Sequence, residues 1–158
     1  MKLEDILKPE RTILGASGAS KKKVLEYISE TAVIDSPSLS DRDVFEILVA
    51  RERLGSTGIG NGVAIPHGRL SNSDQIIALL VLLDEPIDFD AIDRQPVDLF
   101  FTLLVPEEDT EQYLKTLATL AQVFQSAEAL DAIRSAEDSS QLYETMITYY
   151  SKIASASD

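Results

Sequence analysis

His67 is the only histidine in the chain and the side chain best suited to nucleophilic chemistry near pH 7. It lies in the run IPHGR, residues 65–69, where proline restricts the preceding backbone and glycine is expected to clear space behind the ring. A neutral imidazole is a competent nucleophile, and either ring nitrogen can carry a phosphoryl group when a hydrogen bond holds the other. A lone histidine is more often structural, so its interpretation depends on the residues around it.

A glycine-rich segment, residues 55–68, leads up to this histidine with the sequence GSTGIGNGVAIPHG. Glycine lets the backbone approach a ligand closely, and successive amide N–H groups can form an anion-binding concavity. Phosphoryl transfer needs this kind of positioning and charge neutralisation, so we expect an irregular phosphate-binding loop; the alternative is a plain turn between a helix and a strand. The residues predicted to bind phosphate are Gly55, Ser56, Thr57, Gly58, Gly60, Gly62, Gly68 and Arg69.

Arg51 is the cation best placed to support a phosphoryl group. It lies in the last turn of a predicted helix, where a cation complements the helix dipole. The same position can deliver a guanidinium to the glycine segment, where its planar donors could hold phosphoryl oxygens. Arg53 and Arg69 are weaker candidates for this role.

Other chemistries are disfavoured by the residues that are missing. The glycine segment lacks the Gly-Lys-Ser/Thr ending of a nucleotide-binding P-loop, and position 63 is valine where a dinucleotide site needs glycine. The aspartates of the segment 88–93 do not match a calcium loop, so turn and cap roles are predicted for them. With one histidine and no cysteine, we expect no metal site, no hydrolase triad and no cofactor.

Helices predicted from hydrophobic periodicity precede the glycine segment. Ser20 is expected to cap a helix that runs to about Ile34, and Ser40 to cap a second helix that ends near Gly55. The second helix is predicted to bury Val44, Phe45, Leu48 and Val49.

Two continuous apolar runs, 76–83 and 97–105, follow the glycine segment and predict buried strands. From Glu107 the pattern is helical again. A short helix from Ser126 or Ala127 to Ser135 and a last helix capped by Asp138 or Ser139 complete the chain. The first of these three helices is predicted to bury Leu114, Leu117, Ala118, Ala121 and Phe124.

This order of elements predicts an α/β fold of α+β-like character, with a mixed central sheet flanked by helices. The chain of 158 residues has no low-complexity tract, which favours a single domain over 1–158 with a frayed tail over 154–158.

The composition limits the partners and the compartment. A formal net charge of −13 repels nucleic acid and anionic membrane surfaces, so neither is an expected partner. The longest apolar run is too short to span a bilayer, and the first residues do not resemble a signal peptide. Because the chain has no cysteine, a reducing compartment, the cytoplasm, is predicted.

Two stretches resemble the mannitol/fructose-type IIA proteins of the bacterial phosphotransferase system. RER at 51–53 with GSTGIGNGVAIPHGR at 55–69 is similar to the active-site signature, and PIDFDAIDRQPVDLFFTLLVP at 86–106 is similar to a second diagnostic stretch. The resemblance covers nearly the whole chain, and the wording GSTGIGNG with the start SKKKVLEYISETA is similar to the nitrogen-regulatory branch. It implies the mannitol/fructose-type IIA fold, a type-2 IIA domain.

Carried over residue by residue, the resemblance makes His67 the phosphorylated nucleophile and Arg51 the phosphate-supporting residue. It implies a phosphohistidine carrier rather than a classical turnover enzyme. The carrier would accept phosphate from an HPr-like, nitrogen-type phosphocarrier and regulate nitrogen- and potassium-related partners, such as potassium-transport components or sensor kinases.

Two alternatives stay open. One is a sugar-specific IIA that passes phosphate to a IIB domain, and the other is an interaction module that takes no phosphate. Sugar-transporting relatives commonly place a second histidine in the segment matching 112–117, where this chain has Tyr113 and Lys115.

Overall fold

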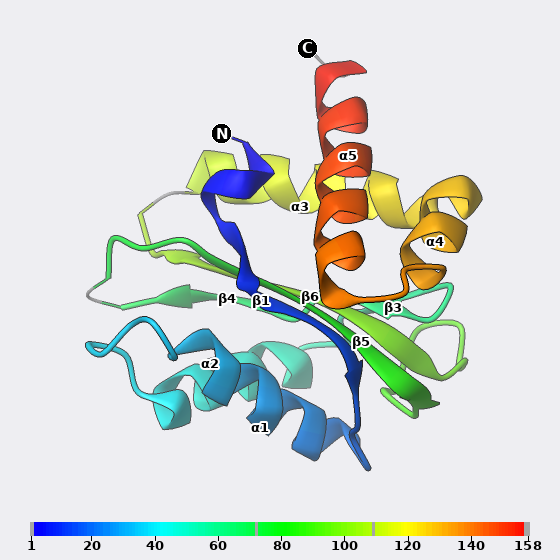
Figure 1. Cartoon of the computed structure of the whole chain (residues 1–158). Coiled ribbons are helices and arrows are strands. Elements are labelled where there is room, and N and C mark those ends of the chain that lie inside the picture. The colour runs from blue at the N-terminus through cyan, green and yellow to red at the C-terminus, as the bar shows by residue number, and fades with distance from the viewer. Residues whose placement is uncertain (1, 72, 109, 157–158) are drawn as a thin grey trace.

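A mixed sheet lies at the centre of the molecule, with helices on both faces (Figure 1). The computed structural model describes residues 2–71, 73–108 and 110–156, and within these ranges the sheet has six strands. Its order is β1-β5-β6-β3-β2, and β4 also pairs with β6. The predicted mixed α/β fold is therefore confirmed. No helix in these ranges has the length and apolarity of a membrane span.

The two central strands are β5, Ile77–Ile87, and β6, Val97–Pro106, which run antiparallel and pair Leu80 with Phe101. Both are almost continuously apolar because helices cover the sheet on each side. They confirm the two predicted strands, although β5 continues beyond the predicted end to Ile87.

An edge strand, β1, Leu7–Ala16, pairs in parallel with β5 after a short 3-10 helix, Leu3–Asp5. The sequence pattern predicts no element here because residues 8–11 of the strand, KPER, are mostly polar. The buried Arg11 donates hydrogen bonds from its guanidinium to the carbonyls of Ile6 and Ala78, at 2.9 and 3.1 Å, where the ladder register shifts. A strand therefore precedes the helix that was predicted to begin after Ser20.

One face of the sheet is covered by α1, Lys21–Ala32, and α2, Asp41–Arg53 (Figure 1). Both predicted caps are confirmed, since Ser20 Oγ accepts from Lys23 N and Ser40 Oγ accepts from Asp43 N. The first helix ends at Ala32, earlier than predicted. The second helix packs through Val44 and Leu48, whereas Phe45 and Val49 are only partly buried.

Three helices cover the opposite face and contact the other side chains of β5 and β6 (Figure 1). Ser126 caps the second of them, and Asp138 Oδ1 accepts from Gln141 N at the start of the third, as predicted. The last helix extends to Ala156, so residues 154–156 are helical rather than frayed, and residues 157 and 158 lie outside the described residues. The bounds are Thr110–Gln125 for α3, Ala127–Arg134 for α4 and Ser139–Ala156 for α5.

The predicted buried face of α3 is only partly correct, because Phe124 is buried and Leu117 is partly buried against the core but the other predicted residues are not buried. Leu114 is 57% exposed, whereas Tyr113, Thr116 and Leu120 are buried. Thr116 can be buried because its hydroxyl donates to the carbonyl of Gln112 at 2.8 Å, so the threonine brings no unsatisfied donor into the core. The helix α3 is therefore rotated about its axis relative to the orientation predicted from its apolar residues alone.

The glycine segment is more regular than predicted. It contains three short strands, β2, Gly58–Gly60, β3, Val63–Ala64, and β4, His67–Leu70. A tight hairpin joins β2 to β3, and both Asn61 and Gly62 have positive φ there. Because β3 and β4 both run parallel to β6, the segment is anchored at the centre of the sheet.

Candidate functional site

His67 begins β4 and is held by a hydrogen bond at each ring nitrogen. Nδ1 lies 2.7 Å from the carbonyl oxygen of Ile65, which can only accept, so Nδ1 carries the ring proton. Nε2 lies 3.1 Å from Nε of Arg51, which can only donate, so Nε2 presents its lone pair. The geometry selects the neutral tautomer in which Nε2 is the nucleophilic nitrogen.

The surroundings of His67 favour this neutral form. Burial of the half-exposed ring lowers the pKa of His67 below its ordinary value of 6.5, and the positive charge of Arg51 lowers it further. The hydrogen bond to Ile65 and the charge of Glu52 act in the opposite direction and do not overcome the burial. The ring is therefore unprotonated at Nε2 at neutral pH.

Arg51 reaches the site from the last turn of α2. Its Nη1 donates to the carbonyl of Gly55 at 2.8 Å while its Nε donates to His67. Two hydrogen bonds on different sides of one planar guanidinium fix its orientation as well as its position. The structure thus brings the predicted histidine and arginine into direct contact.

Tyr113, on α3, lies on another side of the His67 ring. The two ring centroids are 5.8 Å apart, and the planes are tilted by 56°. The guanidinium of Arg69 lies over the Tyr113 ring at 5.2 Å from its centroid and donates to Thr110 Oγ1 at 3.2 Å. Burial raises the pKa of the Tyr113 hydroxyl, although Arg69 and Arg51 oppose the change. A neutral hydroxyl therefore lies near two cations, Arg69 and Arg51, on this side of the imidazole.

A comparison with known families agrees with this arrangement. Residues 5–149 match the family model described as phosphoenolpyruvate-dependent sugar phosphotransferase system, EIIA 2. The chain belongs to this family. Membership of the EIIA 2 family supports a phosphocarrier role within the phosphotransferase system, whose IIA proteins interact with phosphocarriers and other proteins.

Individual EIIA 2 relatives are similar over most of their length. A nitrogen regulatory protein of Pseudomonas aeruginosa is 46% identical over 147 residues, which are 93% of this chain and 96% of that protein. The crystal structure of IIA-Ntr from Neisseria meningitidis superposes with a TM-score of 0.86 at 37% identity, covering 94% of this chain and 98% of that one. These findings confirm the predicted resemblance to the nitrogen-regulatory branch.

The mannitol IIA protein of Escherichia coli shares the EIIA 2 fold at lower identity. Its structure superposes with a TM-score of 0.70 at 15% identity and covers 87% of this chain and 96% of that one. At this identity the likeness shows the fold alone, which is the mannitol-type IIA fold predicted from the sequence.

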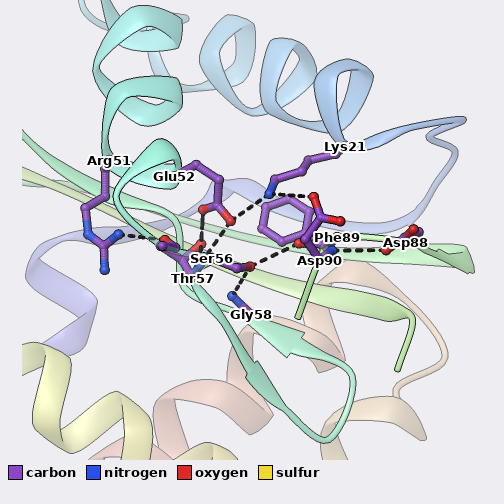
Figure 2. A network of polar contacts seen from close by, with 10 residues as sticks. Lys21, Arg51, Glu52, Ser56, Thr57, Gly58, Asp88, Phe89 and Asp90 are labelled. Carbon is purple, nitrogen blue, oxygen red and sulfur yellow. Dashed lines mark hydrogen bonds and ion pairs between the residues drawn. The ribbon is translucent and has the colours of Figure 1, made fainter. Parts of the chain in front are cut away.

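In this EIIA 2 chain, residues 56–58 form hydrogen bonds within the protein (Figure 2). The amide of Thr57 donates to the carboxylate of Glu52 at 3.0 Å, and the amide of Gly58 donates to Ser56 Oγ at 3.1 Å. Ser56 Oγ in turn donates to the carbonyl of Phe89 at 3.0 Å. These two amides thus have protein acceptors instead of pointing into an open anion cradle.

The remaining glycines of the predicted loop lie elsewhere. Along β6, the partners of Val63 and His67 are four residues apart, so the β2–β3 hairpin with Gly60 and Gly62 begins roughly 13 Å from the histidine. A Cβ on Gly62 would lie 2.6 Å from Arg134 Nη2, in the ion pair of that arginine with Asp98. The hairpin glycines therefore serve a turn beside this ion pair.

Gly68 provides space for a helix rather than for the imidazole ring. A Cβ at this position would collide with Cγ2 of Ile47 on α2. The missing side chain lets α2 approach β4 closely enough for Arg51 to reach His67.

Glu52 is the residue at this site that sequence reasoning missed. Its side chain is only 5% exposed and lies 3.0 Å from Lys21 Nζ. Figure 2 shows this ion pair. The signal in the sequence was its spacing: Glu52 follows Val44 and Leu48 at intervals of four, which places a carboxylate on the buried stripe of α2. A charged residue at a core position is rare unless it has partners.

The aspartates of the segment 88–93 have the predicted turn roles. Asp88 Oδ1 accepts from Asp90 N at 3.0 Å, and Asp93 Oδ1 accepts from Gln95 N at 3.1 Å. Asp90 also pairs with Lys21 at 3.3 Å, which ties this loop to the start of α1. Arg53 is exposed and lines an open groove between α1 and α2, apart from the Arg51–His67 contact.

Proposed function

We propose that this chain is a cytoplasmic, single-domain phosphohistidine carrier that accepts a phosphoryl group on Nε2 of His67 from an HPr-like, nitrogen-type phosphocarrier. The observation that supports the proposal is the pair of hydrogen bonds on the ring. The bond from Nδ1 to Ile65 holds the proton on one nitrogen and leaves the lone pair on the other.

In the proposed transfer, the Nε2 lone pair attacks the phosphorus atom of the incoming phosphoryl group. The bond from phosphorus to the donor atom of the carrier breaks, and its electron pair stays with the carrier. Arg51 exchanges its hydrogen bond to Nε2 for bonds to the phosphoryl oxygens, and its charge offsets theirs. The proton stays on Nδ1 throughout and is donated in the hydrogen bond to the Ile65 carbonyl.

Phosphorylation would change the surface that partners meet. It adds about 1.5 to 2 negative charges between Arg51 and Tyr113. Such a change alters which partner can dock through desolvation and charge repulsion. We therefore propose that the carrier regulates nitrogen- and potassium-related proteins, such as potassium-transport components or sensor kinases, by its phosphorylation state.

The test is reconstitution with phosphoenolpyruvate, the general phosphotransferase enzyme and its small phosphocarrier. We expect one phosphoryl group that is stable in base and lost in acid, as a phosphoramidate is. His67→Ala should accept none, while Lys22→Ala, an exposed change, should accept phosphate normally. Acid-stable label that persists in His67→Ala would contradict the proposal.

A second experiment separates regulation from sugar transport. Unmodified protein, phosphorylated protein and His67→Ala are each used to capture partners, and phosphorylated protein is mixed with sugar-specific IIB domains. The regulatory function predicts capture profiles that differ with phosphorylation. Fast transfer to one IIB domain with identical profiles would instead support the sugar-specific alternative.

A further inference from the structure

Two hydrogen-bonded arms hold the two nitrogens of His67. In the first arm, Arg51 bonds both to His67 Nε2 at 3.1 Å and to the carbonyl of Gly55 at 2.8 Å. In the second arm, the Ile65 carbonyl accepts from His67 Nδ1 at 2.7 Å, and the Ile65 amide donates to the carbonyl of Thr57 at 2.9 Å. One arm therefore leads to Gly55 and the other to Thr57, two residues apart in the same loop.

Glu52 joins these two arms at their base, and Figure 2 shows its bonds to Thr57. It follows Arg51 directly on α2, and its carboxylate accepts from the amide of Thr57 at 3.0 Å and from Thr57 Oγ1 at 2.6 Å. The connected path therefore closes on itself through Arg51, His67, Ile65, Thr57 and Glu52. Within this path, the carboxylate of Glu52 is the group that links α2 to Thr57.

From this closed path we propose that Glu52 is a positioning residue for phosphoryl transfer, which fixes both hydrogen-bond partners of His67 by holding Thr57 against the end of α2. This inference rests on the proposed function. Glu52 itself touches neither the imidazole nor the phosphoryl group; it acts through Arg51 and through Thr57.

The position requires a carboxylate. Three donors converge on it, namely the Thr57 amide, the Thr57 hydroxyl and the ammonium of Lys21. A glutamine would turn an NH₂ group toward one of these donors and lose an acceptor. Burying a charge is costly, and the ion pair with Lys21, itself held by Asp90, compensates for it.

A purely structural role would not need this chemistry. Position 52 continues the apolar stripe of Val44 and Leu48, where a leucine or methionine of similar volume could pack without a charge to neutralise. The bonds of the carboxylate point instead at the loop that carries the Thr57 and Gly55 carbonyls. The arrangement therefore secures loop geometry rather than helix packing.

The experiment compares Glu52→Gln with Glu46→Gln, a matched change at an exposed position of the same helix. Thr57→Val is a second variant that removes one hydrogen bond and keeps the side-chain shape. We expect Glu52→Gln to lower kcat for phosphate acceptance about tenfold or more with KM for the carrier nearly unchanged, because misplacement of a reacting group reduces the rate at saturation. Thr57→Val should show a smaller loss and Glu46→Gln none.

A double-mutant cycle with Arg51→Ala shows whether Glu52 acts through the arginine. If it does, the effect of Glu52→Gln should shrink to about threefold or less in the Arg51→Ala background, since coupled residues are not additive. Full additivity of the two rate losses would overturn the proposal.

The nitrogen spectrum of the single imidazole tests the same inference without phosphate. We expect wild type to hold the proton on Nδ1, and Glu52→Gln and Thr57→Val to show a mixture of tautomers. Unchanged tautomer and unchanged kcat in both variants would overturn the positioning role while leaving the carrier function intact. Failure of wild type to accept phosphate on His67 would overturn the carrier function instead. If Glu52→Gln does not fold, Thr57→Val decides the outcome by the same two measurements.

Discussion

The ring of Tyr113 lies 5.8 Å from the ring of His67, with its plane tilted by 56°. The contact joins α3 to β4 and covers one side of the imidazole. Because burial is the largest cause of the lowered pKa of His67, this tyrosine contributes to keeping the histidine neutral. Tyr113 thus acts on His67 through its bulk.

Removing the Tyr113 ring should raise the pKa of His67. In Tyr113→Ala, water reaches the imidazole, so the pKa should return toward 6.5, whereas Tyr113→Phe should keep it low. The proposed phosphate acceptance needs the neutral ring. As the pH is lowered, the transfer rate of Tyr113→Ala should therefore begin to fall at a higher pH than the wild-type rate does. An NMR titration of the only imidazole measures the pKa directly. A pKa that is equal in all three proteins would show that Tyr113 does not shield the ring.

Loss of Arg51 should slow phosphate acceptance much more than it affects folding. A cation at a helix C-terminus contributes at most about 1 kcal/mol to the free energy of unfolding at a surface position. In the proposed transfer, Arg51 leaves Nε2 to bind the phosphoryl oxygens, so Arg51→Ala should accept phosphate at least about tenfold more slowly. Urea denaturation and rapid-quench kinetics measure the two effects. Arg42→Ala, an exposed change on the same helix, is the control and should leave both unchanged.

Substitutions at Gly62 and Gly68 should separate stability from transfer. Gly62→Ala places a side chain at positive φ and should cost about 1–2 kcal/mol of unfolding free energy, while the folded protein should accept phosphate normally. Gly68→Ala should push α2 away from β4 through Ile47 and slow transfer. Adding Ile47→Ala to Gly68→Ala makes room for the new methyl group and should restore part of the rate. A rate that stays low in this double variant would exclude the steric explanation.

Much of the fold could be predicted because its signals are local. Ser20 and Ser40 cap the helices that they precede, and the apolar runs of β5 and β6 identify buried strands by composition alone. The edge strand β1 was not predicted because its polar first half is held in the sheet by Arg11. The Arg11 guanidinium donates hydrogen bonds to carbonyls of two other segments. The hydrophobic periodicity of a ten-residue segment cannot indicate a hydrogen bond to another segment of the chain.

In the candidate site, too, the local features could be predicted and the contacts between segments could not. The spacing of Arg51 and His67 around a glycine segment indicated both residues, and the structure places them in contact. The sequence did not reveal that the Thr57 amide donates a hydrogen bond to Glu52, because that bond depends on how the loop turns back on α2. The glycines were assigned to phosphate as a group, whereas the structure divides them among a loop, a hairpin and a helix contact.

The hydrogen bond from Arg51 also bears on the competition between phosphate and trace metals for the imidazole. Neutral imidazole nitrogens are common ligands of zinc, copper and nickel ions. A divalent cation that approaches Nε2 must displace a donor from the lone pair and remain beside a permanent positive charge. The same guanidinium attracts an anionic phosphoryl group. One side chain therefore gives this histidine a preference for oxyanion chemistry over metal coordination before any partner has bound.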